Sequence, residues 1–500
     1  MHYVSLIVEF LRGRPGVVFW FAALAQAVLW VIVPSLFYSA PPGDLALLLG
    51  IGHEFRLGSY LGPPLAFWLG ELVFRAGGIV GVYVLSQACI VIALWAVFTL
   101  GRAIVGTRHA VLAILLMTGI AAFNVPTPEF GPSIAALPLW ALAMLHYWRA
   151  IGEDRRGYWF LLGLDLGLLL LADYTGIILV AALLLFTLVT ERGRRSLMHV
   201  EPGLGLVLLA IVVFPHGMWL KDSWQLVFAT FTESPRDGLW MPAVRLLSVV
   251  ALSHVGVALL ALLASGWRLR ERERAPEIDR LPVEPSGRNY VYVLALVPTL
   301  IAIAATIWLG GLGPTARIAP IVLVTALGII VAAGGRIYLY RERMVSMAWM
   351  ALLTMPALLT ALAVLGAPWI TAHEFSTNQP AKAMGDFFGD TFQRRIGKPL
   401  PFVAGDTKLA TLIAMNAPRR SRVYLQETPE RSPWANAADL RANGAILIWP
   451  ATDTTGTPPP AIKAAFPDIT PELPRAFGRP IQGRLPLMRV GWAVLRPAAR

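Results

Sequence analysis

Long apolar runs separated by short polar segments dominate the first 370 positions of the chain. Several runs are close to 20 residues long, and at about 1.5 Å per residue such a helix crosses roughly 30 Å of bilayer hydrocarbon. The pattern predicts eleven membrane-spanning helices, at residues 17–38, 79–100, 109–124, 133–148, 158–172, 174–190, 203–220, 242–266, 289–309, 317–336 and 346–367. The expected fold class is therefore a polytopic α-helical membrane protein.

The run 158–190 is too long for one span, and arginines flank both of its ends. A segment that leaves and returns to the same side must contain a turn. We therefore expect two short helices with a break near Asp173.

Lys and Arg are concentrated in alternate segments between the predicted spans, on the side that carries Arg12 and Arg14. By the positive-inside rule this side is cytoplasmic. Residues 39–62, 125–132, 221–241 and everything after 367 are then outside, which in a bacterial inner membrane means the periplasm. The net charge of +12 is explained by this asymmetry, so no nucleic-acid partner is expected.

Composition supports the same class, since 56% of residues are hydrophobic and only 14% are charged. Cys89 is the only cysteine and lies inside an apolar run, which excludes a disulfide framework and a thiol metal cluster. The first apolar run is longer than a typical signal-peptide core, and we expect it to be a retained helix.

The first outer segment contains an apolar stretch too short to cross the membrane. Residues 63–75, "PPLAFWLGELVFR", would reach only about 20 Å as a helix. Their Pro-Pro start and mixed polarity predict a helix at the outer interface. Residues 44–55 predict a companion helix with Asp44 near its N-cap.

From residue 369 the apolar runs shorten and polar residues return. Strands are predicted at 399–405, 421–426, 444–450 and 489–495, with helical or irregular stretches at 406–416 and 434–443. We therefore expect a transmembrane domain at 1–368 and a small periplasmic α/β domain at 369–500. Residues 456–460, "GTPPP", predict a loop, and 268–288 predict a solvated charged connection.

Polar groups gather in three predicted outer segments. They are Asp44, His53, Glu54, Arg56 and Tyr60 in the first, Glu129 in the second, and His216, Lys221 and Asp222 in the third. Carboxylates, imidazoles and a lysine at one membrane interface could bind a phosphorylated lipid and deprotonate an acceptor hydroxyl.

Each of these residues also has an ordinary structural explanation. Asp44 could be a helix cap, Glu129 a solvated turn acid, and His216 a satisfied interfacial histidine. Lys221 could extend from a helix end to the interface, and Asp173 could simply mark a turn. No phosphate-cradling glycine loop, HExxH motif or paired cysteine ligands occur in the sequence.

The order of these segments resembles a known family. The stretch "GDLALLLGIGHEFRLGSYLGPPLAFWL" is similar to the first outer loop of the family 39 glycosyltransferases of the GT-C superfamily, which use polyprenyl-phosphate sugars. This group includes dolichyl-phosphate-mannose protein mannosyltransferases and the aminoarabinose lipid A transferases. Residues 123–150, 173–186 and 214–222 match later segments in the same order, so the resemblance covers roughly 15–340.

The sequence departs from the family pattern at three places. Leu45 replaces the second acid of the family's Asp-Glu pair, Gly62 replaces the residue before Pro-Pro, and Asp173 stands where a basic residue is common. With Leu45 in place of an acid we expect no tightly bound ion, although some GT-C enzymes use a divalent metal.

The resemblance implies an inverting enzyme that moves a sugar from a polyprenyl-phosphate donor to a periplasmic acceptor: an envelope lipid, lipopolysaccharide or protein. Asp44 would be the catalytic base, with Glu129 as a second acidic group. The residues implied in binding the donor phosphate or the substrates are His53, Glu54, Arg56, Tyr60, His216, Lys221 and Arg317. The expected partners are the donor, a lipid or glycolipid acceptor and membrane lipids. A lipid transporter or flippase, and an inactive GT-C relative that binds lipid, are the alternatives.

Overall fold

The computed structural model describes residues 6–125, 129–232, 238, 240–265, 276–313, 315–451 and 455–498. The chain divides into two compact units. The first comprises Met1–Ile32, Leu61–Ala66 and Val84–Ala357, and the second comprises Val33–Tyr60, Phe67–Tyr83 and Leu358–Arg500. Two segments near the first predicted outer loop thus belong to the same unit as the tail. The domain boundary near residue 369 stays a prediction.

Six described helices are long and apolar enough to cross a membrane, which is the architecture of a multi-pass membrane protein. They are α2 (Pro15–Phe37), α4 (Leu65–Val105), α7 (Pro132–Tyr147) with the π-helical turn Trp148–Gly152, α11 (Glu201–Thr232), α14 (Pro285–Leu309) and α16 (Glu342–Ile370). A seventh span is formed if α12 (Met241–Ser253) and α13 (Val255–Ala264), bent by 41°, count as one. The helical fold class is confirmed, whereas the number eleven stays a prediction.

Shorter elements complete the first unit. They are α1 (Leu6–Gly13), α5 (Thr107–Met117), α6 (Ala121–Asn124), α8 (Tyr158–Ala172), α9 (Gly176–Val189), α10 (Glu191–Ser196) and α15 (Thr325–Ala332). The break between α8 and α9 lies at residues 173–175, so the predicted split near Asp173 is confirmed.

Two stretches differ from the sequence prediction. The predicted span 317–336 contains only the eight-residue helix α15, because Gly311, Gly313 and Pro320 favour turns before it. Part of the predicted solvated connection, Glu277–Asp279 (β1), pairs with Arg336–Tyr338 (β2) in an antiparallel ribbon. Residues 266–275 of that connection lie outside the described residues.

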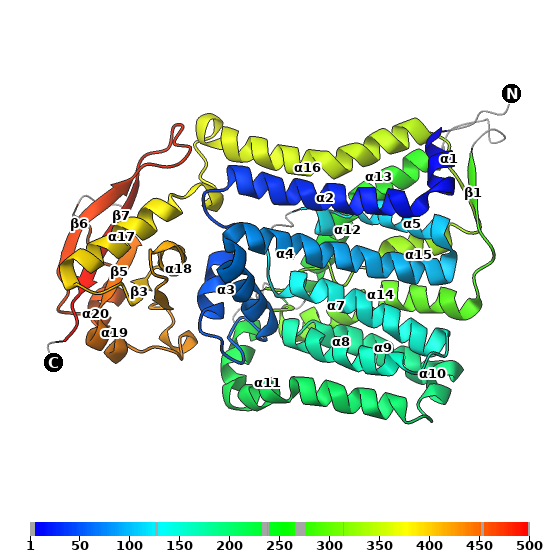
Figure 1. Ribbon diagram of the computed structural model, residues 1–500, viewed down its shortest axis with the longest axis horizontal. Helices are drawn as coiled ribbons and strands as arrows, with labels where there is room; N and C mark the ends of the chain where they lie inside the picture. The colour runs from blue at the N-terminus through cyan, green and yellow to red at the C-terminus, as the bar shows by residue number, and fades with distance from the viewer. Residues whose placement is uncertain are drawn as a thin grey trace. The chain divides into compact units, whose positions relative to one another are not determined.

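Small residues let α8 and α11 pack closely, and the two helices lie side by side in Figure 1. A Cβ added to Gly163 would lie 2.2 Å from the carbonyl oxygen of Gly205, and one added to Gly205 would lie 2.5 Å from the carbonyl oxygen of Trp159. Close backbone approach through glycines is a usual way for helices to associate in lipid.

Helix α4 is interrupted at Gly78, whose φ of 62° and ψ of −158° are not helical. Its 41 residues would make a straight helix about 60 Å long, twice the hydrocarbon thickness. The N-terminal part, 65–77, corresponds to the predicted interfacial helix, and the part after Gly78 is the apolar span.

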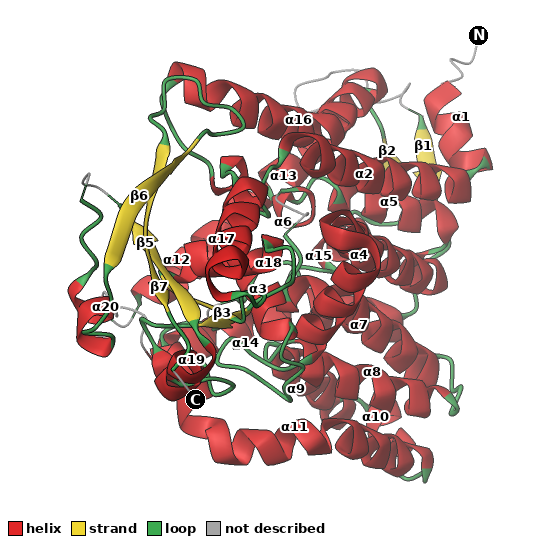
Figure 2. Cartoon of the chain, turned by 60° about the vertical axis from the view of Figure 1, so that its left-hand side comes forward, coloured by secondary structure: helices red, strands yellow, loops and turns green. Residues whose placement is uncertain are grey.

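The second unit contains a five-stranded sheet in the order β4-β3-β5-β7-β6. Figure 2 labels β3, β5, β6 and β7. The strands are β3 (Phe402–Gly405), β4 (Arg422–Tyr424), β5 (Ala445–Pro450), β6 (Pro471–Phe477) and β7 (Met488–Leu495). β3 is parallel to β4 and β5, whereas β7 is antiparallel to β5 and β6. The helices are α3 (Leu45–Gly52), α17 (Ala381–Ile396), α18 (Thr407–Asn416), α19 (Ala437–Asn443) and α20 (Pro460–Ala465), with 3-10 turns at Ser376–Asn378 and Pro429–Arg431.

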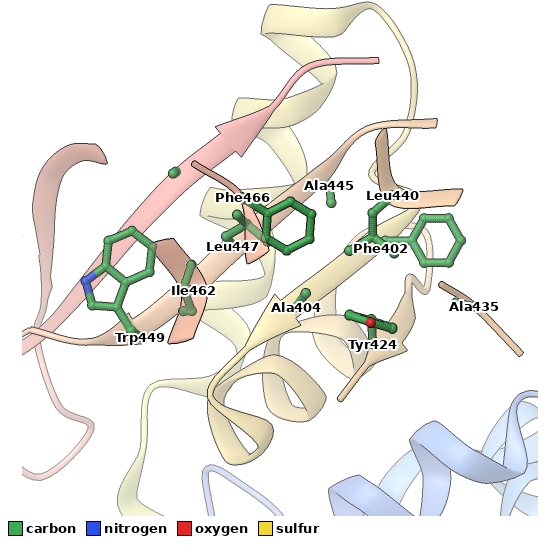
Figure 3. Close-up of a cluster of buried hydrophobic side chains, with 11 residues drawn as sticks. Phe402, Ala404, Tyr424, Ala435, Leu440, Ala445, Leu447, Trp449, Ile462 and Phe466 are labelled. Atoms are coloured by element: carbon green, nitrogen blue, oxygen red, sulfur yellow. The ribbon is translucent and has the colours of Figure 1, made fainter. Parts of the chain in front are cut away.

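One face of this sheet carries the apolar cluster drawn in Figure 3. Phe402 and Ala404 of β3 alternate with residues of the opposite face, as do Ala445, Leu447 and Trp449 of β5. Leu440 of α19, Ile462 of α20 and Phe466, which directly follows α20, cover this face. The four predicted strands and the small C-terminal sheet domain are thereby confirmed.

Candidate functional site

Asp44 precedes α3 at the N-cap position, as predicted. Its side chain is exposed and makes no capping hydrogen bond. No hydrogen bond or ion pair joins the Asp44 carboxylate to any residue that the structure describes. The simple capping role is therefore not observed, and the carboxylate is available for other chemistry.

Tyr60 lies within electrostatic range of Asp44. Its ring is buried, and the guanidinium of Arg431 stacks over it at 4.8 Å from the centroid. Burial raises the pKa of Tyr60 to about 12, Arg431 lowers it in part, and Asp44 raises it further. Tyr60 is therefore a neutral phenol at physiological pH.

A buried carboxylate that sequence reasoning did not single out connects the first outer segment to the tail. Glu71 is fully buried in the N-terminal part of α4. Its carboxylate accepts hydrogen bonds from Arg75, at 2.7 Å, and from Arg420 of the tail, and it lies 3.2 Å from Nδ1 of His53. Arg420 also donates to the Leu49 carbonyl of α3 at 3.1 Å.

A second ion pair joins the same two segments. Arg422 at the start of β4 donates from Nε and Nη2 to both carboxylate oxygens of Glu54, at 2.9 and 2.6 Å. Such a two-pronged bond is geometrically specific. Hydrogen bonding to Glu54 raises the pKa of Arg422 further.

These contacts give His53 and Glu54 structural partners. His53 contacts Glu71, which also binds Arg420, and Glu54 binds Arg422 directly. The predicted roles of His53 and Glu54 in binding substrate stay predictions. Arg56 is exposed, and its carbonyl accepts a bond from the Trp68 indole at 2.9 Å. Together the arginines fix the position of the backbone that carries Asp44.

Within the first unit, Glu129 forms an ion pair with Arg317, so the structure brings together two of the predicted site residues. The Glu129 side chain is 17% exposed and that of Arg317 is 39% exposed. The backbone amide of Arg317 donates to the hydroxyl of Ser133 at 3.1 Å, and that hydroxyl donates to Asp173 at 2.8 Å. Residues 126–128 of the predicted loop lie outside the described residues.

His216 and Lys221 lie inside α11 and not at a helix end, because α11 continues to Thr232. His216 is buried, with Nε2 3.1 Å from the hydroxyl of Tyr174 and its ring stacked on Trp219. Lys221 and Asp222 are exposed. The predicted end of this helix at residue 220 was wrong, since α11 continues to Thr232 and accommodates Pro215 in its interior.

No group of three or more His, Cys, Asp or Glu side chains within the described ranges has the arrangement of a metal site. Leu45 occupies the position next to Asp44 where the family pattern has a second acid, and its side chain is buried and apolar. Within the described residues Asp44 thus belongs to no group of three or more such side chains, and the expectation of no tightly bound ion stays a prediction.

A comparison with protein families agrees with the sequence resemblance. Residues 62–219 match the family described as dolichyl-phosphate-mannose-protein mannosyltransferase. The predicted resemblance to GT-C enzymes is thereby confirmed, although Asp44 lies outside the matched residues. Curated protein sequences gave no match.

Solved structures with a likeness to the chain include oligosaccharyltransferases from Archaeoglobus fulgidus. One, in complex with zinc and sulfate, is 14% identical, with a TM-score of 0.45 over 86% of this chain and 67% of that chain. Another, AglB with an inhibitory peptide and a dolichol-phosphate, is 13% identical, with a TM-score of 0.46 over 88% and 70%.

Proposed function

We propose that this chain, a membrane glycosyltransferase related to the GT-C superfamily, moves a sugar from a polyprenyl-phosphate donor to a hydroxyl of an envelope lipid, lipopolysaccharide or protein. The reaction takes place at the periplasmic face of a bacterial inner membrane. The proposal extends the family match by one local observation: an exposed carboxylate, Asp44, on a segment fixed by buried ion pairs.

Asp44 acts as the general base. It accepts the proton of the acceptor hydroxyl while the hydroxyl oxygen attacks the anomeric carbon of the sugar. The bond from that carbon to the phosphate oxygen breaks, and its electron pair leaves with the polyprenyl phosphate. Attack from the face opposite the leaving group inverts the anomeric centre in one step, with no covalent intermediate between sugar and enzyme.

Positioning supplies much of the rate enhancement, because the phosphate is already a good leaving group. Arg420 and Arg422 hold α3 and the loop after it through Glu71 and Glu54, so Asp44 is presented from a fixed backbone. A base held in place needs no reorganisation when the acceptor arrives.

Positive charge near the phosphate stabilises the leaving group. Arg317 is half-exposed and already paired with Glu129, so it could turn to a phosphate without leaving a deeply buried charge behind. Lys221 is an exposed cation and could serve the same purpose. His216 is assigned to orienting Tyr174 and not to direct phosphate contact.

The test is transfer of label by purified protein in lipid nanodiscs, with radiolabelled polyprenyl-phosphate sugars as donors and extracted envelope lipids as acceptors. Asp44→Asn is expected to lower the rate by at least 100-fold, within the range for loss of a general base. Asp390→Asn changes a second exposed aspartate of the same unit and should retain activity.

Two outcomes would reject the proposal. Unchanged labelling by Asp44→Asn would remove this residue as the base. Movement of donor lipid between leaflets without sugar transfer, in wild-type protein, would instead support the flippase.

A further inference from the structure

An apolar groove lies in the first unit, at the end of the helices that carries the predicted cytoplasmic arginines. It has a volume of about 900 Å³, near the upper end for ligand sites in proteins. Its walls come from α1, α2, α5, α13, α15, β2 and the start of α16. The groove is thus distinct from Asp44 and from the Glu129–Arg317 pair.

Apolar side chains form most of the groove. Leu112 and Leu116 of α5, Leu260 of α13, and Ile330 of α15 contribute, with Trp349 of α16. Leu6 and Phe10 of α1 also line it and are exposed, at 84% and 48%. Exposed apolar side chains on a short helix beside a basic segment are typical of a lipid interface.

Three of the polar lining residues are near helix ends. Ser265 follows the end of α13, Arg336 follows α15, and Glu342 begins α16. A hydrogen bond of 3.2 Å from the Tyr340 amide to the Ala264 carbonyl joins two of these ends. The groove therefore combines an apolar body with one polar mouth.

Among the residues that the structure describes, two oppositely charged side chains at this mouth, Glu342 and Arg336, have hydrogen-bonding capacity left unused. The Oε2 atom of Glu342 is buried and has no hydrogen bond within the part of the chain that the structure describes. Arg336 forms no ion pair with any described residue, and its side chain is exposed. A buried carboxylate oxygen without a hydrogen-bond donor destabilises the folded protein, so we expect a cationic group to donate a hydrogen bond to it.

We propose that the groove binds a phospholipid with a phosphoethanolamine headgroup. The acyl chains occupy the apolar body, the ammonium group donates hydrogen bonds to Glu342, and the phosphate contacts Arg336. An anionic lipid without an amine would satisfy Arg336 and leave Glu342 unpaired. A choline headgroup carries the positive charge but has no N–H to donate.

Quenching of tryptophan by brominated lipid chains tests the proposal on the full chain in phosphatidylcholine nanodiscs. Trp349 lies in the groove wall, so the difference between wild type and Trp349→Phe isolates its signal from those of the other tryptophans. Increasing fractions of brominated phosphatidylethanolamine, phosphatidylglycerol or phosphatidylcholine are compared.

Wild-type protein should reach half-maximal quenching of Trp349 at an at least tenfold lower fraction of phosphatidylethanolamine than of either other lipid. Glu342→Gln should reduce this preference about tenfold, as expected for loss of one charge-assisted hydrogen bond. Arg102→Gln removes an exposed arginine that does not line the groove, and should keep the preference.

Equal quenching by the three lipids, or an unchanged preference in Glu342→Gln, would overturn the proposal. Ala261→Phe provides a second route, because it places a larger side chain in the groove without altering either charge. Retained quenching of Trp349 in that variant would equally contradict lipid in the groove.

Discussion

Arg420 offers a sharp test of how the tail fixes the first outer segment. The Arg420 side chain is 18% exposed, whereas that of its partner Glu71 is fully buried. Arg420 also donates to the Leu49 carbonyl, and its guanidinium stacks over Phe74 at 4.7 Å from the ring centroid. The change Arg420→Gln removes the charge from all three contacts.

The expected cost follows from the burial of Glu71. Removing one partner of a buried ion pair costs roughly 3–5 kcal/mol, because the other charge stays in the interior without compensation. Arg75 remains, but its side chain is 50% exposed and therefore better screened. We take the lower value of about 3 kcal/mol, which corresponds to roughly a 100-fold increase in local opening.

Hydrogen exchange measured by mass spectrometry resolves this local effect in the full-length protein. Peptides that cover 45–54 and 65–77 should exchange about 100-fold faster in Arg420→Gln. The control is Arg395→Gln, which breaks the ion pair between Arg395 and Glu472. The side chain of Arg395 is 42% exposed and that of Glu472 is 35% exposed. An exposed pair contributes at most about 1 kcal/mol, so exchange should rise less than about fivefold.

The double variant Glu71→Gln/Arg420→Gln removes the stranded charge. Its peptides should exchange more slowly than those of Arg420→Gln alone, because a neutral amide is cheaper to bury than a carboxylate. Exchange in Arg420→Gln no faster than in the Arg395→Gln control would refute the argument, and so would a double variant that opens more than the single one.

Two further changes test other contacts. Glu54→Gln weakens the two-pronged bond to half-exposed Arg422 and should destabilise the outer segment by about 1–2 kcal/mol. The measurement is faster hydrogen exchange in residues 45–60, and unaltered exchange would argue against this contact. Gly163→Leu forces α8 away from Gly205 and should lower the free energy of unfolding by about 1–3 kcal/mol. The melting temperature, followed by thiol labelling of buried Cys89 as the protein unfolds, should therefore fall. Gly203→Leu, where a Cβ meets nothing within 4 Å, is its control and should melt as wild type does.

Local chemistry was enough to predict much of the architecture. The apolar run 17–38 corresponds to helix α2, because a long run of apolar side chains favours a membrane-spanning helix independently of distant parts of the chain. The strand β5 was equally predictable, since all but its last residue are buried and the segment is rich in β-branched and aromatic residues. Asp44 was placed at the start of a helix by its position before an apolar run.

Other elements gave weaker signals. The strand β6, "PELPRAF", contains two prolines and lies at the edge of the sheet, where a missing amide donor is tolerated. Helix α17 has a low mean hydropathy, but Phe388 and Phe392 are buried four residues apart. That spacing was the signal that could have revealed it.

The sequence by itself determined that the chain crosses a membrane and ends in a small α/β domain, because these features depend on residues that are neighbours along the chain. Only the tertiary structure decided which charges meet. Glu71 and Arg420 are separated by 349 positions, and each alone is typical of a solvated interfacial residue. Their pairing depends on how α3, α4 and the tail pack, since burial excludes water and leaves each charge with the other as its partner.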